Sequence, residues 1–166
     1  MSNQEKEVLL LCNLVRLYPK KFACVYLSSA DYSINGDNSY VVSLLNDLNN
    51  CRPHNVLYPC LELYKAAESH ALDMGKHGME GHNSSNGTTC PNRVKSFYPR
   101  FAGECCEYGS SAPIMIVLDL LIDYGITSLG HRKMILETKA DVIGIAIRDH
   151  LTYSTNTVMD FGYRGE

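Results

Sequence analysis

The spacing of the hydrophobic residues changes along the chain, and this change constrains the fold more than any other feature. Up to about residue 125, apolar residues recur every three or four positions, which is the repeat of helices packed on one face. From residue 142 onward, β-branched residues gather in short runs, and the polar segment 148–150 indicates a turn between a strand at 142–147 and one or two strands at 151–161. Helices followed by strands predict an α+β fold rather than a parallel sheet built from repeated β-α-β units.

Start and stop signals predict where the helices lie. Ser2 and Glu5 form a capping box, so the first helix is expected to begin there and to end near Tyr18, before Pro19. Pro59 suits the first turn of the third helix, and the glycine at position 75 offers that helix a left-handed end. The expected helices cover residues 2–18, 40–50, 59–75, 91–97 and 113–124, and the polar, glycine-rich stretch 75–89 is expected to be a loop.

Length and charge narrow the class of protein. The 166 residues contain no stretch with the composition of a linker, so we expect one domain over residues 1–166. The net charge is −3 and the Lys and Arg residues are scattered, which argues against nucleic acid as a partner. The longest apolar run near the start is too short to cross a bilayer, so no transmembrane segment is predicted.

The beginning of the chain and its cysteines bear on the cell compartment. Residues 1–7 lack the basic region and apolar core of a secretory signal, so either the protein stays inside the cell or a leader has been removed. The seven cysteines lack the paired spacing of zinc fingers. We expect most of them to be buried as small hydrophobic residues, and the sequence leaves their disulfide pairing open.

Four polar residues at the edges of the expected elements are candidates for a functional site. His82 and His131 each follow a glycine, Glu104 follows another, and Asp123 ends an apolar helix. The other histidines, at positions 54, 70, 77 and 150, are expected to be solvated or capping side chains. Residues 160–162 spell the magnesium motif of protein kinases, but the chain lacks the other kinase motifs, so we attribute this match to chance.

The order of short motifs along the chain carries a family resemblance. The motifs are Gly81-His82, Asn92-Arg93-Val94, Ala102-Gly103-Glu104, Leu121-Ile122-Asp123-Tyr124-Gly125, Gly130-His131-Arg132-Lys133, Val142-Ile143-Gly144-Ile145 and Val158-Met159-Asp160-Phe161. In this order and spacing, the sequence from about Glu5 to Phe161 resembles the CAP superfamily of cysteine-rich secretory proteins, venom allergens and pathogenesis-related proteins, in its bacterial-type SCP branch. The most specific part is the Gly-His-Arg-Lys segment that follows an apolar helix.

The resemblance implies both a fold and a site. The fold is an α-β-α sandwich in which a small, mainly antiparallel sheet lies between helices, and the site is an open cleft with two histidines and two acids. Transferred by motif, these are His82, Glu104, Asp123 and His131, with Asp119 as the alternative second acid. His77, on the same loop, is the alternative to His82.

Two residues beside this expected cleft depart from the family pattern. Cys105 stands where the family commonly has Asn, and Leu129 stands where an Arg often precedes the Gly-His-Arg segment. Side chains next to a site orient the groups within it, so these changes weaken any transfer of a ligand from relatives.

Imidazoles beside carboxylates suggest a cation site. Neutral histidine nitrogens at His82 and His131 would bind zinc or another divalent cation weakly, with the two acids orienting the rings. We expect a secreted, periplasmic or cell-surface binding domain for a lipid or another small molecule, rather than an enzyme. The alternatives are a metal-dependent hydrolase with Glu104 as general base, and a hydrolase in which the Cys105 thiolate acts beside His131.

Overall fold

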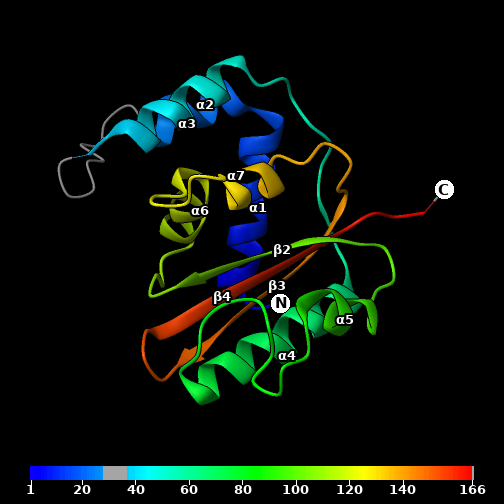
Figure 1. Cartoon of the computed structure of the whole chain (residues 1–166). Helices are drawn as coiled ribbons and strands as arrows, with labels where there is room; N and C mark the ends of the chain where they lie inside the picture. Colours follow the sequence, from blue (N-terminus) through cyan, green and yellow to red (C-terminus); the bar gives the residue numbers. More distant parts are fainter. Residues whose placement is uncertain (28–36, 166) are drawn as a thin grey trace.

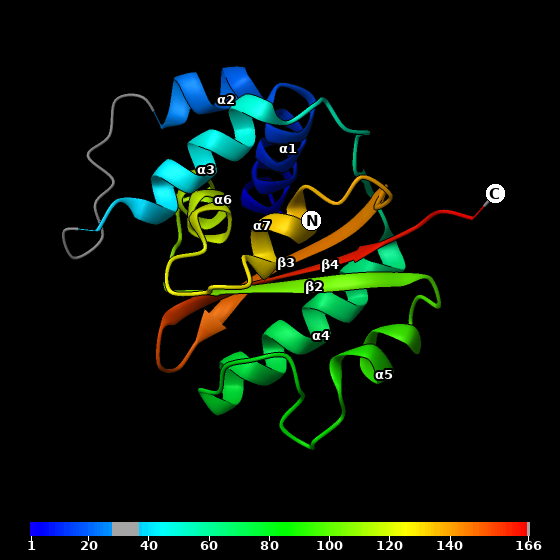
Figure 2. The ribbon, with the colours of Figure 1, turned by 45° about the horizontal axis from the view of Figure 1, so that its top comes forward.

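The computed structural model describes residues 1–27 and 37–165, and it shows helices on both faces of one sheet (Figures 1 and 2). The described helices are α1 (Asn3–Leu17), α2 (Pro19–Tyr26), α3 (Ser39–Asn50), α4 (Leu61–His77), α5 (Cys90–Lys95), α6 (Pro113–Ile122) and α7 (Gly130–Ile135). The strands are β1 (Tyr58–Pro59), β2 (Phe101–Tyr108), β3 (Val142–His150) and β4 (Ser154–Gly162). The predicted α+β class and α-β-α sandwich are confirmed.

The sheet has the strand order β1-β3-β4-β2. Strands β3 and β4 form an antiparallel hairpin, and β2 pairs antiparallel with β4. Only the short β1 runs parallel to its neighbour β3. The sheet is therefore mainly antiparallel, as expected, and β2 forms one of its two edges.

The two faces of the sheet carry side chains of different size. Ile145 and Met159 belong to the large hydrophobic core shared with α1, α3 and α6, whereas Ala146 and Val158 pack with small residues of α4. At Gly144 the helix approaches so closely that a Cβ atom would lie 2.1 Å from the backbone nitrogen of Tyr64. Figure 2 shows the result, with α4 and α5 on one face and the remaining helices on the other.

Several predicted element boundaries were wrong for local reasons. The capping box of Ser2 and Glu5 is present, but Pro19 begins a further helix, α2. Helix α4 continues past Gly75 and ends at Gly78, whose φ of 63° is left-handed. Gly75 instead lies inside the helix, where a Cβ atom would lie 2.1 Å from the carbonyl oxygen of Asp149.

The strands also differ from their predictions. Segment 148–150 belongs to β3 and the turn follows it. Within the strand, Arg148 pairs with the buried Glu5 and the half-buried Glu68, which are far away in the sequence. Strand β2 was not predicted, since its sequence mixes a glycine, two glutamates and two cysteines. No helix among the described residues has the length and apolar character needed to cross a membrane.

Candidate functional site

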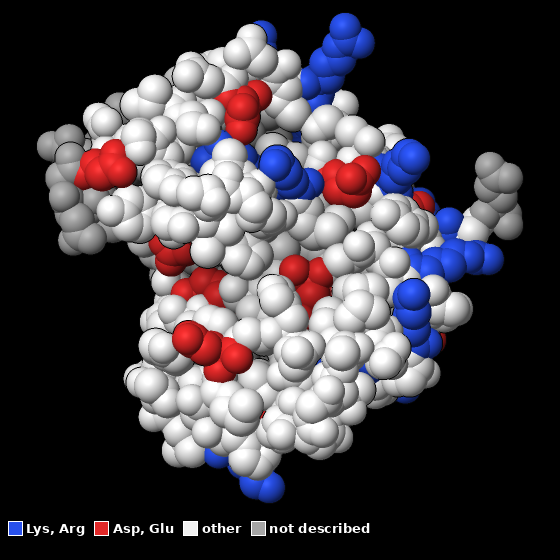
Figure 3. Space-filling model, viewed as in Figure 1, with Lys and Arg blue, Asp and Glu red and all other residues white. Residues whose placement is uncertain are grey.

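An open hollow of about 360 Å³ lies along the edge strand β2. Its walls come from the second half of β2, the end of α6, the start of α7 and the turn between β3 and β4. In Figure 3 this face of the molecule is hollowed between its two helical layers, and acidic side chains gather there. Two histidine-carboxylate pairs flank the edge of the sheet.

The first pair is His131 and Asp123. Asp123 takes a left-handed conformation after α6, with φ of 59°, which Asp adopts more readily than most residues. Its Oδ2 accepts a hydrogen bond from the backbone N–H of His131 at 3.0 Å, and its Oδ1 accepts one from Nδ1 of the His131 ring at 2.7 Å. Asp119, the alternative acid, instead accepts a hydrogen bond from Oγ of Ser110 at 2.7 Å.

The second pair is His82 and Glu104. His82 follows Gly81, whose φ of 102° suits glycine, on the loop after α4. Nδ1 of His82 donates to Oε1 of Glu104 at 2.9 Å. His77, the alternative histidine, stays on α4 and contacts Asp73 of its own helix.

Arg93 joins both members of this second pair. Its guanidinium contacts the Glu104 carboxylate and also donates to the backbone oxygen of His82 at 2.8 Å. Burial alone would raise the pKa of Glu104, but the His82 hydrogen bond and the Arg93 charge hold it below its ordinary value. The hydrogen bond to Glu104 in turn raises the pKa of His82. Glu104 is therefore an ionised carboxylate that is bound by both His82 and Arg93.

The structure brings the two rings together across the cleft, although 49 positions separate them in the sequence. The centroids of the His82 and His131 rings are 6.5 Å apart. Both rings direct Nδ1 at a carboxylate, which places the proton on that nitrogen and leaves the lone pair on Nε2. Among the described residues, neither Nε2 atom has a hydrogen-bond partner. Two imidazole nitrogens are thus available to a ligand.

Comparison with known protein families shows which family the chain belongs to. The family model described as the cysteine-rich secretory protein family, CAP, matches residues 45–161. This chain belongs to the CAP family. Among curated proteins, none matches the chain.

Three solved structures share the fold of this CAP protein. An outer surface protein from Borrelia burgdorferi is 22% identical with a TM-score of 0.56, over 78% of this chain and 96% of that chain. Venom allergen-like protein 4 from Schistosoma mansoni is 12% identical with a TM-score of 0.59, over 100% of this chain and 92% of that one. An extracellular protein containing a SCP domain, from Bacillus anthracis str. Ames, is 16% identical with a TM-score of 0.50, over 82% of this chain and 45% of that one.

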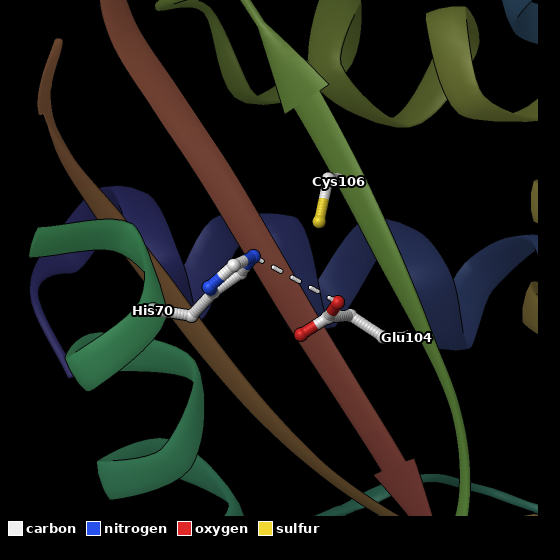
Figure 4. A group of neighbouring side chains, drawn as sticks. All are labelled: His70, Glu104 and Cys106. Carbon is white, nitrogen blue, oxygen red and sulfur yellow. Dashed lines mark ion pairs between the residues drawn. The ribbon is translucent and has the colours of Figure 1, made fainter. Parts of the chain in front are cut away.

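His70 holds the loop that carries His82, a role the sequence did not indicate. It was expected to be solvated, but it is completely buried, and its Nε2 donates to the backbone oxygen of Gly81 at 2.9 Å. Figure 4 shows His70, Glu104 and Cys106 close together, with possible ligand atoms within 4.8 Å of one another. Because the His70 Nε2 proton is used and burial raises the pKa of Cys106 well above that of an ordinary thiol, this group is poorly suited to a metal ion.

Asp160 is the second residue that sequence reasoning missed. It lies opposite Glu104 in the pairing of β2 with β4, is completely buried, and has no hydrogen-bond partner for either oxygen among the described residues. Burial and the charge of Glu104 raise the pKa of Asp160 well above its ordinary value. The sequence signal that could have identified it is a single acid among the apolar residues of an expected strand, but residues 160–162 were considered only as a chance match to a kinase motif.

Cys105 and Leu129, the two departures from the family pattern, lie at well-defined positions in the fold. Cys105 faces the large core, and its Sγ lies 3.8 Å from the backbone oxygen of His131. Burial raises the pKa of Cys105 well above that of an ordinary thiol, which disfavours a thiolate nucleophile. Leu129 takes a left-handed conformation, with φ of 52°, immediately before α7. Of the other cysteines, Cys12, Cys90 and Cys106 are also buried.

Proposed function

We propose that this CAP domain is a binding protein whose cleft holds a divalent cation of the zinc type between His82 and His131, together with a small ligand in the adjoining hollow. The observation that carries the proposal is the pair of rings, 6.5 Å apart, each with Nδ1 on a buried carboxylate and Nε2 left without a protein partner. Histidines that bind metal commonly donate their other ring N–H to a carboxylate in this way. A zinc ion so bound would keep open positions for water or ligand atoms.

The two acids support the rings rather than the cation. Glu104 is occupied by His82 and Arg93, and Asp123 is occupied by the ring and backbone of His131. With two protein ligands instead of the four of a structural zinc site, we expect weak to moderate affinity.

The contacts that Glu104 makes with His82 and Arg93 also favour a binding role over hydrolysis. A metal-dependent hydrolase would need Glu104 to accept a proton from water as a general base. The Glu104 side chain is 1% exposed, it is paired with Arg93, and its pKa lies below the ordinary value. A buried carboxylate in this state is a poor base, so we favour the binding role.

The extent and location of the domain are part of the proposal. The family match begins at residue 45, but Val8, Leu11 and Val15 of α1 pack into the same hydrophobic core as Met159 of β4. This packing supports one CAP domain over the whole chain. We propose that it acts outside the cell or at its surface, because two bacterial structural neighbours are an outer surface protein and an extracellular protein.

Calorimetric titration with zinc tests the cation site. We expect wild type to bind one zinc ion at pH 7.5 and the His82→Ala/His131→Ala double variant to bind none. His77→Ala is the matched control, because the His77 side chain is 41% exposed and contacts Asp73 of its own helix, and it should bind as wild type does. Equal binding by wild type and the double variant would refute the site, as would wild-type binding that is unchanged at pH 5, where histidines are protonated.

A further inference from the structure

Glu107 is a buried acid that the two histidine pairs do not use. It lies near the end of β2, is 6% exposed, and lines the hollow beside His131. Its Oε1 accepts a hydrogen bond from the backbone N–H of Ser110 at 2.9 Å, while its Oε2 has no partner among the described residues. An unpaired buried carboxylate oxygen is rare in native proteins and calls for an explanation.

Asp119 lies next to Glu107 and is held by the same residue. Oγ of Ser110 donates to Oδ2 of Asp119 at 2.7 Å, so Ser110 contacts both acids. Burial and the charge of Asp119 raise the pKa of Glu107 to about 7, and burial raises the pKa of Asp119. A positive group placed between these two acids would stabilise their charged forms.

The remaining walls of the hollow also suit a positive group. Glu80 and Asp123 line it, whereas none of its described lining residues is Lys or Arg. The lining includes the rings of Tyr108, Tyr124 and Tyr153, and aromatic faces attract cations. In Figure 3 the Lys and Arg side chains of this face lie mostly above and to the right, away from the gathered acids.

An organic cation fits these walls better than a metal ion does. The groups of three ligand atoms within 4.8 Å of one another, among the described residues, are His70-Glu104-Cys106 and Cys90-Glu104-Asp160, and both exclude Glu107 and Asp119. A hollow of about 360 Å³ also exceeds the needs of a single ion. We propose that Glu107 and Asp119 form a subsite for the protonated amine of a ligand, with the tyrosine rings packed around its carbon chain. The proposal rests on the proposed function only in placing the ligand in this cleft.

Titration with butylammonium chloride, followed by amide chemical shifts in NMR spectra at pH 8, tests the subsite. We expect shifts in residues of the hollow, and at least a tenfold weaker affinity in the Glu107→Gln/Asp119→Asn double variant. The control Glu7→Gln changes an exposed acid on α1 and should bind as wild type does. Butanol, which has the same chain without the charge, should not bind.

Three results would overturn the inference: equal binding of butanol, equal binding by the double variant, or displacement of butylammonium by stoichiometric calcium chloride. If the double variant does not fold, the single Glu107→Gln and Asp119→Asn variants decide the question by the same affinity comparison. Zinc titration separates this inference from the cation site. If wild type binds butylammonium but not zinc, only the proposed cation site is contradicted. If wild type binds zinc but not butylammonium, only the amine subsite is contradicted.

Discussion

Asp160 lies directly opposite Glu104 on the neighbouring strand, and the side chains of both acids are buried. Glu104 is held as a carboxylate by Arg93 and His82, whereas the oxygens of Asp160 have no partner among the described residues. Burial and the charge of Glu104 raise the pKa of Asp160 well above its ordinary value, which favours the protonated form of Asp160.

The variant Asp160→Asn replaces this buried acid with an uncharged amide of the same shape. Because the folded-state pKa of Asp160 is raised, its protonated form supports the fold at low pH, and that support is lost as pH rises through the raised pKa. We expect wild type to lose more stability than the variant between pH 5 and pH 9 in urea unfolding. An equal loss in both proteins would contradict a neutral Asp160.

Glu107→Gln should show a related effect at lower pH. The pKa of Glu107 rises from 4.5 to about 7 on folding, so its contribution to stability is complete below pH 4.5 and is lost as pH rises through 7. At pH 8 we expect the variant to exceed wild type in free energy of unfolding by about 3 kcal/mol, with little difference at pH 4. Glu7→Gln, on the surface, should show no such gain. A Glu107→Gln variant less stable than wild type at pH 8 would refute the burial argument.

Removal of Arg93 should expose the cost of an unpaired buried charge. Arg93 is 6% exposed, and its loss removes the positive charge paired with the buried Glu104 carboxylate, so Arg93→Met is expected to cost about 3 to 5 kcal/mol of stability. Arg93→Lys keeps the charge and should cost less, while the exposed Arg52→Met should cost almost nothing. Urea unfolding at pH 7 measures all three, and a loss below about 1 kcal/mol for Arg93→Met would mean that the pair behaves as a surface ion pair.

Helical periodicity and caps could be read from the sequence because they depend on residues a few positions apart. The capping box of Ser2 and Glu5 is such a signal, and the structure contains it. Strand β2 escaped prediction because its sequence, with a glycine, two glutamates and two adjacent cysteines, lacks the alternation of apolar and polar residues that marks a half-buried strand. Strand β3 extends to His150 because Arg148 pairs with Glu5, 143 positions away.

The candidate site likewise combines residues that sequence motifs could identify with residues whose role depends on long-range contacts. The positions of His82, Glu104, Asp123 and His131 came from motif order, and the structure gives each ring its own carboxylate. The burial of His70 and of Asp160 depends on contacts between α4, β2 and β4, and no local pattern in the sequence records such contacts.

X-ray absorption at the zinc edge, on protein loaded with one equivalent of zinc at pH 7.5, determines whether His82 and His131 hold the cation. We expect nitrogen and oxygen atoms only around the zinc ion, at about 2.0 to 2.2 Å, with the scattering pattern of two imidazole rings. That pattern should disappear in the His82→Ala/His131→Ala variant. A sulfur atom at about 2.3 Å would contradict the account, because it would place zinc at a cysteine-containing group rather than between the two cleft histidines.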